Sequence, residues 1–492
     1  MTETNVTGIR GDYIPAVLEE YFLNGDSYIT MSDAYAVCTE RNRSYAEFVV
    51  DLAEQLRRGN VAQEGERLYL AKTLRYENYA AIRLADIVRD NSMARPPFTT
   101  DLTRSGDIRL CAQQCAAVIM ALSNRLSIVL GGAGTGKSTL IRKILEERPD
   151  GEYVLAAPTG KAARNLQERT GFRARTMHSA LEIFPNEDAL KPVVWEWVSL
   201  VVIDEASMVT LEMMAALLSK VRHDCRIVLV GDPEQLGSVG SGDVLNDCLG
   251  LGFPCIRLKQ NFRQTDKNAE LFRNVDGFVS IRSEDQLGYD DSFRRAEPDE
   301  RAVVEEALRH KQVQVISPFN NAVDRLNTEL RGRFNPAAPE KREIWSRERV
   351  FRDGDRVLIT KNNGALGCVN GDVGIFRIDD DDVFEPVYHV ELDGNRCPQW
   401  WGYEGLENMT LAYAITVHRS QGSQYDVVLF YVPEEKSNLQ RNLLYTAISR
   451  AKKQEIIYCS RQTLDAAIRT PPRRRNSMLM DKAMAAFLEL VA

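Results

Sequence analysis

The segment with the clearest chemical meaning is a glycine-rich octapeptide, GGAGTGKS, at residues 131–138. It matches the pattern G-x-x-x-x-G-K-[ST], in which backbone N–H groups surround phosphates, the lysine reaches the terminal phosphates and the hydroxyl binds Mg²⁺. It follows an apolar run and precedes a predicted helix that begins near Lys137, so a phosphate site is favoured over a simple tight turn. The residues predicted to bind a nucleotide are Gly131, Gly132, Ala133, Gly134, Thr135, Gly136, Lys137, Ser138 and Thr139, with Ser138 also a magnesium ligand.

Two carboxylates end another apolar run, LVVIDE, at residues 200–205. A carboxylate at the end of a strand can hold the Mg²⁺ shell, and its neighbour can orient or deprotonate an attacking water. We therefore assign Asp204 to the metal and Glu205 to the water. Taken alone, these residues would indicate a solvated loop, and it is the phosphate loop that favours the catalytic interpretation.

Three further side chains are candidates for sensing or stabilising a terminal phosphate. Gln235 follows the apolar run 227–230, where a polar turn is the alternative interpretation. Arg263 and Arg450 lie in QNFRQ and YTAISR, and a guanidinium aimed at a γ-phosphate lowers the barrier to phosphoryl transfer. A lone arginine is more often a surface residue, so both assignments depend on the other motifs.

The segments that must position these residues are apolar runs alternating with predicted helices. The runs are 127–130, 153–156, 200–203 and 227–230, followed by a second set at 313–316, 427–430 and 456–458. Because they are continuous rather than alternating, they predict strands covered on both faces, and hence parallel sheets surrounded by helices. The sequence therefore predicts an α/β fold with two such domains in tandem.

Changes in this pattern suggest domain boundaries. The predicted units are a mainly helical docking domain at 1–100, a first α/β domain at 105–264, a second at 265–330 and 410–475, and a tail at 476–492. Asn-Gly and Asp-Gly pairs indicate hairpins, so residues 331–409 are predicted to form a small inserted β module. The basic segment Pro471–Arg475 is expected to be solvated.

Composition excludes several classes of protein. With 62 basic and 70 acidic residues among 492, the net charge of −8 excludes a uniformly basic nucleic-acid binder and leaves only a local groove for such a partner. No apolar run reaches the length of about 18 residues that a membrane helix needs, and the first residues lack the pattern of a signal peptide. The nine cysteines are scattered without a CxxC pair, as expected for a cytoplasmic protein.

In chain order the motifs resemble those of superfamily 1 helicases, and the residues within them resemble those of the RecD-like branch. They are Gln114, the phosphate loop, APTGKAA at 157–163, TMH at 176–178, DEAS at 204–207, GDPEQ at 231–235, NFR at 261–263, TVHRSQGS at 416–423 and YTAISR at 445–450. GERLYL at 65–70 and ALGCVNGDVG at 365–374 resemble segments of the RecD subunits of RecBCD-type exodeoxyribonuclease V.

The resemblance implies two RecA-like motor domains with an ATP and Mg²⁺ site between them and an SH3-like inserted module. Gln114 would join the nucleotide contacts, Arg450 would reach across from the second domain, and Gln235 and Arg263 would report the γ-phosphate. The implied contacts to DNA are Pro158, Thr159, Lys161, Thr176, His178, Thr416, His418 and Ser420. Departures from the family pattern are Gly237 for proline, Gln424 for glutamate and Ser449 for threonine.

The implied activity is that of an ATP-dependent 5′–3′ helicase acting on single- and double-stranded DNA in double-strand-break repair by recombination. RecB and RecC subunits would be its partners, and it would have no nuclease site of its own. Two alternatives stay open: a stand-alone RecD-like helicase, and an interaction subunit whose motor works only inside a complex.

Overall fold

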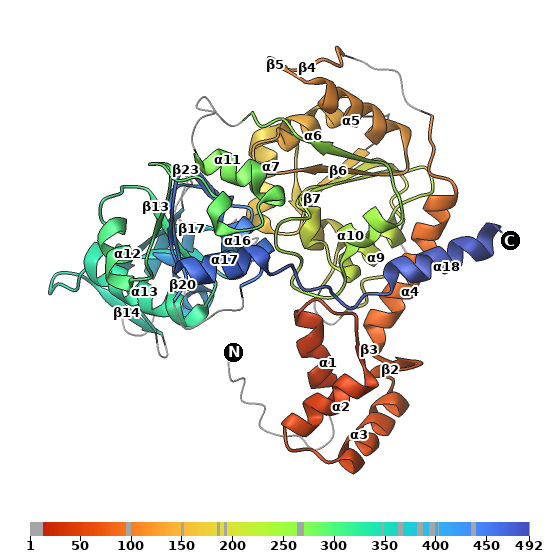
Figure 1. Cartoon of the computed structure of the whole chain (residues 1–492), viewed down its shortest axis with the longest axis horizontal. Helices are drawn as coiled ribbons and strands as arrows, with labels where there is room; N and C mark the ends of the chain where they lie inside the picture. Colours follow the sequence, from red (N-terminus) through yellow and green to blue (C-terminus); the bar gives the residue numbers. More distant parts are fainter. Residues whose placement is uncertain are drawn as a thin grey trace.

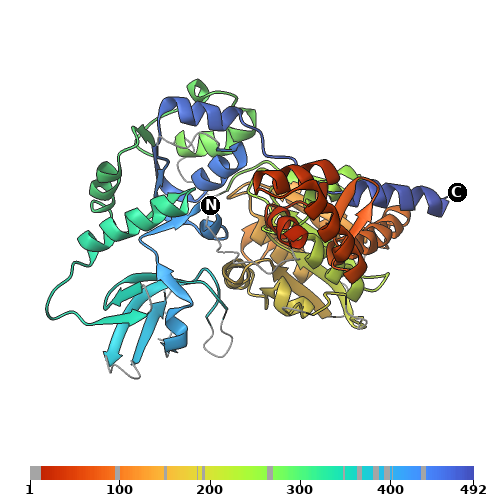
Figure 2. The same cartoon turned by 90° about the horizontal axis from the view of Figure 1, so that it is seen from below.

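The structure is a computed structural model. It describes residues 13–94, 100–148, 152–184, 187–190, 194–262, 270–346, 349–362, 368–380, 387–392, 399–401, 403–433 and 439–491. Two α/β units lie side by side, the N-terminal unit adjoins the first of them, and the β module adjoins the second (Figures 1 and 2). Within the described residues, no helix has the length and apolar character needed to cross a membrane.

The first sheet has six parallel strands, and all four of its predicted strands are confirmed. Its order is β11 (Cys255–Leu258), β6 (Leu126–Gly131), β10 (Arg226–Gly231), β9 (Val198–Ile203), β7 (Glu152–Ala157) and β8 (Arg175–Thr176). Successive residues of β6 belong to different cores: Ile128 and Leu130 to one face, and Val129 to the other. Burial on both faces explains why the runs are continuously apolar.

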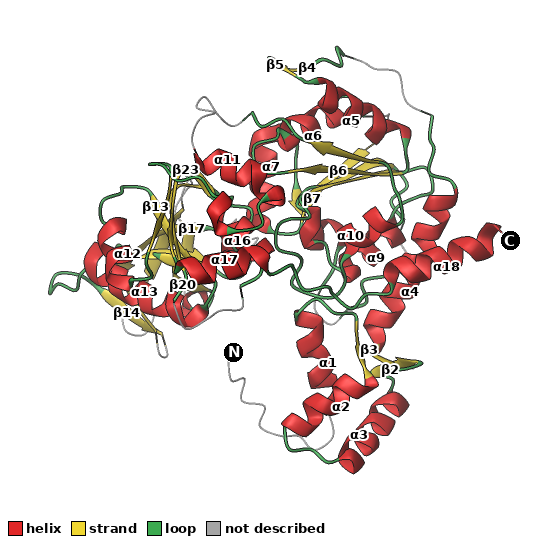
Figure 3. Ribbon diagram, viewed as in Figure 1, coloured by secondary structure: helices red, strands yellow, loops and turns green. Residues whose placement is uncertain are grey.

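Helices cover both faces of the first sheet (Figure 3). They include α5 (Ala112–Ser123), α6 (Lys137–Glu146), α7 (Gly160–Thr170), α8 (Met177–Leu181), α9 (Leu211–Lys220) and α10 (Val244–Gly250), with the 3₁₀ turn η1 (Ala206–Met208). A two-stranded ribbon, β4 (Arg104–Ser105) with β5 (Ile108–Arg109), precedes α5.

Two helices distant in the sequence complete one face of this sheet. Helix α4 (Ala71–Arg89) contributes Tyr76 and Leu84, and helix α18 (Leu479–Val491) contributes Leu479 and Ala483, to the core that also holds Ile128. The two helices pack on each other. The segment 479–491, expected to be a tail, is thus a packed helix, because its apolar residues at helical spacing bury against α4.

The N-terminal unit is mainly helical, as predicted. It comprises α1 (Tyr13–Leu23), α2 (Met31–Glu40), α3 (Tyr45–Arg58) and an antiparallel sheet of order β1 (Tyr28–Thr30), β3 (Arg67–Leu70), β2 (Val61–Glu64). Ser44 and Glu47 form a reciprocal capping box that fixes the start of α3. The unit has its own small core, which includes Ile29 and Leu68.

The second sheet is also parallel, and its three predicted strands are confirmed. Its order is β12 (Phe293–Ala296), β23 (Ala451–Tyr458), β22 (Tyr425–Tyr431), β13 (Val313–Ser317) and β21 (Ala414–Thr416). Around it lie α11 (Glu270–Gly277), η2 (Phe278–Ser280), η3 (Glu284–Gln286), α12 (Glu300–Ala307), α13 (Asn320–Phe334), α15 (Val417–Ser420), α16 (Arg441–Ile448) and α17 (Arg461–Arg469). Phe430 and Leu429 enter cores on opposite faces.

The predicted β module is an antiparallel sheet packed around Phe351, Phe376 and Tyr388. Its order is β19 (Gln399–Trp401), β18 (Val387–Leu392), β17 (Val373–Asp380), β16 (Arg356–Ile359) and β20 (Met409–Leu411), beside the hairpin β14 (Glu343–Ser346) and β15 (Arg349–Arg352) and helix α14 (Tyr403–Leu406). An ion pair between Arg164 on α7 and Asp372 joins the module to the first α/β unit.

Candidate nucleotide-binding site

The glycine-rich loop connects strand β6 to helix α6, as predicted. Gly134 and Gly136 have φ angles of +86° and +79°, which glycine adopts without steric strain. The Nζ atom of Lys137 donates hydrogen bonds to the carbonyl oxygens of Gly131 at 2.6 Å and Gly132 at 2.9 Å. The loop therefore carries its cation at the N-terminus of α6, where backbone N–H groups favour an anion.

Residues from two other segments buttress this loop. Asn261 donates its side-chain amide to the carbonyl of Ala133 at 3.1 Å, and the Phe262 N–H donates to the carbonyl of Gly134 at 2.8 Å. Gln114 is buried, and its amide nitrogen lies 3.4 Å from the carbonyl of Gly136. Gln114 thus supports the backbone of the glycine-rich loop.

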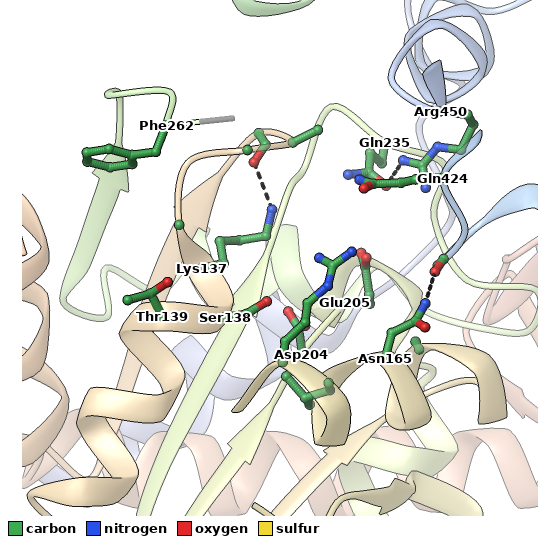
Figure 4. A pocket seen from close by; sticks show the side chains of 18 residues that line it. Lys137, Ser138, Thr139, Asn165, Asp204, Glu205, Gln235, Phe262, Gln424 and Arg450 are labelled. Carbon is green, nitrogen blue, oxygen red and sulfur yellow. Dashed lines mark hydrogen bonds between the residues drawn. The ribbon is translucent and has the colours of Figure 1, made fainter. Parts of the chain in front are cut away.

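A cavity of about 450 Å³ opens in front of the loop (Figure 4). Its lining includes Gly132, Ala133, Gly134, Gly136, Lys137, Ser138, Thr139, Asp204, Glu205, Gln235 and Arg450, all predicted to serve a nucleotide site. Gln114, Gly131 and Thr135 are buried outside this lining; Thr135 donates its hydroxyl to the carbonyl of Gly132 at 3.0 Å. Arg263 lies outside the described residues.

The two predicted carboxylates follow strand β9 and line the cavity. Burial of the Asp204 carboxyl, and then the neighbouring charge of Glu205, raise the pKa of Asp204, while Lys137 and Arg169 oppose that shift. Glu205 has a φ of +53°, a conformation that costs a non-glycine residue about 1–3 kcal/mol. This strained turn places two adjacent carboxylates at one strand end.

The residues at this strand end fit a magnesium ion. The Oδ1 atom of Asp204 is buried without a hydrogen-bond partner, and Ser138 lines the same cavity. Mg²⁺ is bound by oxygen ligands and commonly by one or two carboxylates together with substrate phosphates. A single buried carboxylate oxygen beside a hydroxyl meets that requirement.

The second α/β unit closes the cavity through Arg450. Its Nη2 atom donates to Gln235 Oε1 at 3.1 Å across the domain boundary, and its Nε atom donates to the carbonyl of Thr446 at 2.9 Å. Burial lowers the pKa of Arg450, and the nearby charge of Glu205 partly offsets the effect. Its hydrogen bonds therefore hold the guanidinium in place near Glu205.

Other bonds join the loop after β10 to the second unit. The Tyr445 hydroxyl donates to Asp232 at 2.8 Å, and the Leu236 N–H donates to the Thr446 hydroxyl at 2.8 Å. Gln421 donates to the carbonyl of Leu236 at 3.1 Å. The loop that carries Gln235 belongs to the first unit and is thus hydrogen-bonded to the second unit.

Seven lining residues were not predicted as site residues: Ala162, Asn165, Leu166, Arg169, Phe262, Gly422 and Gln424. Asn165 donates to the carbonyl of Gly422 at 2.7 Å, which links α7 to the second unit. The ring of Phe262 lies against Gly136 and is 45% exposed, so it offers a flat apolar face to the cavity. Phe262 could have been found from the sequence, because it belongs to the same motif as Arg263. Asn165 could not, because no sequence pattern shows which side of α7 meets the second unit.

The predicted DNA contacts occupy helix starts on both units. Thr159, Thr176 and Thr416 are the N-cap residues of α7, α8 and α15, and each side chain accepts a backbone N–H. Lys161 lies in the first turn of α7, with its Nζ 5.9 Å from the centre of the Tyr425 ring. His178 lies on the short helix α8.

His418 lines a second cavity, of about 350 Å³, together with Ser207 and Leu236. Three predicted contacts are buried in this structure: Pro158 where β7 ends, Thr416 and Ser420. Ser420 is fully buried and donates to the carbonyl of Val417 at 2.7 Å. Their contact with DNA stays a prediction.

Two parallel sheets that share one phosphate-loop cavity define a tandem α/β protein of the P-loop class. Three family models match the chain: an AAA domain over residues 109–276, the ATP-dependent RecD-like DNA helicase SH3 domain over 326–389 and the UvrD-like helicase C-terminal domain over 411–458. A structure of two coordinating Pif1 helicases at forked DNA has a TM-score of 0.50 at 21% identity, and covers 78% of this chain and 98% of that one.

Curated relatives place the chain more narrowly. The RecBCD enzyme subunit RecD of Mycolicibacterium smegmatis is 31% identical, with 72% of each chain covered. The ATP-dependent RecD2 DNA helicase of Deinococcus radiodurans is 33% identical over 86% of this chain and 60% of its own length. The chain belongs to the RecD family, and it spans about 60% of the length of the Deinococcus relative.

Proposed function

We propose that this chain is an ATP-hydrolysing DNA helicase that moves 5′ to 3′ along single-stranded DNA. The observation that carries the proposal is the shared cavity, in which Gln235 of the first motor is bonded to Arg450 of the second. A cavity built from both motors couples nucleotide turnover to their relative position. Membership of the RecD family supports DNA as the track.

Each residue in the cavity has a chemical role in this proposal. Lys137 and the N-terminus of α6 bind the phosphates, and Glu205 orients and deprotonates the attacking water. Arg450 stabilises the charge that develops on the transferred phosphoryl group, and Gln235 senses its presence. Ser138 and Asp204 would hold Mg²⁺, which neutralises phosphate charge when bound.

Hydrolysis would be converted to movement by two grips on the strand. Thr159 and Lys161 lie at the start of α7 on the first motor, and Thr416 and His418 lie at the start of α15 on the second. Closing the cleft changes the separation of these grips, and alternate release gives directed motion. Phosphate contacts of this kind need no overall positive charge, only a few donors in one groove.

We further propose that the motor works in the cytoplasm as a RecD subunit with RecB and RecC, in double-strand-break repair. No described residue of the N-terminal unit lines the nucleotide cavity, and Tyr45, Val49 and Val50 on α3 are 63%, 42% and 70% exposed. These exposed apolar side chains support a docking role. The alternative, a stand-alone helicase, is supported by the similarity to a protein named RecD2.

The decisive experiment is strand displacement by the purified chain on duplexes with either a 5′ or a 3′ single-stranded tail. Unwinding from the 5′ tail only is expected, and it should disappear in Lys137→Gln. Arg142→Gln, on the exposed side of the same helix, is the matched control and should unwind normally. Unwinding from the 3′ tail, or an ATPase that survives Lys137→Gln, would contradict the proposal.

A second experiment distinguishes a RecD subunit that works with RecB and RecC from a stand-alone helicase. Val50→Glu should leave the ATPase unchanged but prevent co-purification with RecB- and RecC-type subunits, because it places a charge in the docking face. If the wild-type chain unwinds alone and no such subunits co-purify with it, the stand-alone alternative is correct.

A further inference from the structure

A segment after the second motor returns to the first, and we call residues 470–478 the C-terminal strap. It leaves α17 beside the second motor, where Arg473 N–H donates to Gln440 at 3.1 Å. It ends on the first motor, where Ser477 donates to Asp247 at 2.9 Å and Met478 N–H donates to Glu77 at 3.0 Å. Figure 1 shows it crossing from α17 to α18 (blue).

Arg475 fixes the middle of the strap to a loop of the first motor. Its guanidinium donates to the hydroxyl and the carbonyl of Ser238, both at 2.6 Å, and to the carbonyl of Gly242 at 2.9 Å. Residues 471–474 are exposed, as predicted, but the prediction of a solvated segment is wrong for Arg475. Its guanidinium donates to the hydroxyl and carbonyl oxygens of one loop and thereby orders that loop.

The loop held by Arg475 is the one that bridges the two motors. Its first part carries Gln235, which lines the nucleotide cavity and bonds to Arg450. Its second part carries Val239, which is 59% exposed and lines the second cavity with His418. The same short segment therefore touches the nucleotide site, the partner motor and a predicted DNA contact.

Gly237 makes room for this arginine. A Cβ atom at position 237 would lie 2.6 Å from Arg475 Nη2, closer than Cβ contacts allow. Because the clash would be with the far end of a flexible side chain, Gly237→Ala displaces the guanidinium without disturbing a packed core.

We propose that Arg475 is a positioning residue, which holds the bridging loop so that DNA binding is communicated to Gln235 and Arg450 in the nucleotide cavity. The inference rests on the proposed helicase function and extends it to the strap. Its simplest rival is a purely mechanical role, in which Arg475 only anchors α18. That helix has other anchors, since Lys482 pairs with Glu64 at 2.8 Å and with Glu77 at 3.3 Å.

The test is the ratio of ATPase rates with and without single-stranded DNA, measured on the full chain. Arg475→Ala should lower this ratio about fivefold or more, the scale of one allosteric coupling, and Arg475→Lys should restore part of it. Gly237→Ala should reproduce the loss, and the double variant should be no worse than either single variant, because both remove one contact. Arg474→Ala changes the exposed neighbour and should match wild type.

Other outcomes decide against the inference or against its foundation. If Arg475→Ala lowers only the melting temperature and leaves the ratio unchanged, the anchoring role is correct and the inference fails. If Arg475→Ala does not fold, Gly237→Ala decides alone. If affinity for DNA falls in both variants while the ratio at saturating DNA is unchanged, coupling is also excluded. A wild-type chain that no DNA stimulates would instead refute the proposed function.

Discussion

The two parallel sheets share an architecture but face the nucleotide cavity with opposite ends of their strands. The carboxyl ends form the first edge, on the first sheet, and the amino ends form the second edge, on the second sheet. On the first sheet, the phosphate loop, Asp204 and Gln235 all follow the carboxyl ends of strands. On the second sheet, Gln424 and Arg450 directly precede β22 and β23. Helices begin after the carboxyl ends of strands, so the first edge offers free N–H groups for phosphate, whereas the second offers side chains.

This difference indicates a division of labour. The first sheet can bind a nucleotide through its own loop, and the second sheet adds a charge and a set of bonds to the loop that carries Gln235. Substitutions on the first edge should therefore affect binding and chemistry together. Substitutions on the second edge should affect mainly the rate.

The largest effect should come from the first edge. Asp204→Asn should lower kcat for ATP by about 10²- to 10³-fold, because it removes the proposed metal ligand. Thermal stability should not fall, since the Asp204 carboxyl is buried and its ionised form is already disfavoured. Steady-state ATPase and thermal melting measure the two effects, with exposed Asp285→Asn as the control. Normal turnover in Asp204→Asn would remove the metal assignment.

Next in size is the second edge. Arg450→Lys should lower kcat about 10²-fold with little change in the KM for ATP, because a lysine keeps the charge but cannot hold Gln235 and the Thr446 carbonyl together. ATPase kinetics over a range of ATP concentrations separate the two constants. A raised KM at normal kcat would show that the second sheet binds the ground state, which would break the comparison.

A smaller effect is expected where Tyr445 of the second motor meets the first motor beside Gly132 of the phosphate loop. Tyr445→Phe removes the 2.8 Å bond to Asp232 and should cost about 1 kcal/mol of unfolding free energy. The DNA-stimulated ATPase should fall by about threefold. Tyr413→Phe, which removes a 3.3 Å bond to Asp355, is the matched control and should leave turnover unchanged. Equal ATPase rates in both variants would mean that this contact only stabilises the fold.

The last prediction concerns stability alone and addresses how α18 is attached to the first motor. Burial raises the pKa of Asp247 to about 7, and Ser477 donates to it. The unfolded value is about 3.9, so the folded chain binds the proton more tightly and its unfolding free energy falls as pH rises from about 4 to 7. Asp247→Asn should therefore be more stable than wild type at pH 8, by about 2 kcal/mol, with a difference that shrinks as pH falls and vanishes near pH 4. Urea unfolding at both pH values measures it, and a wild-type chain more stable than the variant at pH 8 would reverse the sign.

Local sequence patterns predicted most of the fold. Seven of the eleven strands of the two sheets, and the phosphate loop, were readable because burial on both faces and a strand-to-helix turn leave marks within a few residues. The Gly237 departure was visible in the sequence, but its neighbour was not. Arg475, which is 238 positions away, meets the loop only in the folded chain.

What could not be predicted depends on contacts between distant segments. Asn165 and Arg169 face the cavity because α7 turns that side toward the second motor, and the spacing of residues within α7 does not reveal this. Ser420 is buried because the turn at α15 closes over it. The roles of all predicted site residues, Arg263 among them, stay predictions until the variants are measured.

The pairing of α4 with α18 has a consequence for the order of synthesis. Translation releases α4 and the first sheet long before residues 479–491 leave the ribosome, with the whole second motor made in between. Until then, the face formed by Tyr76, Leu84 and their neighbours lacks its last helix. Domains usually fold as they emerge, but here the first motor to be translated is completed only by a helix that follows the whole second motor.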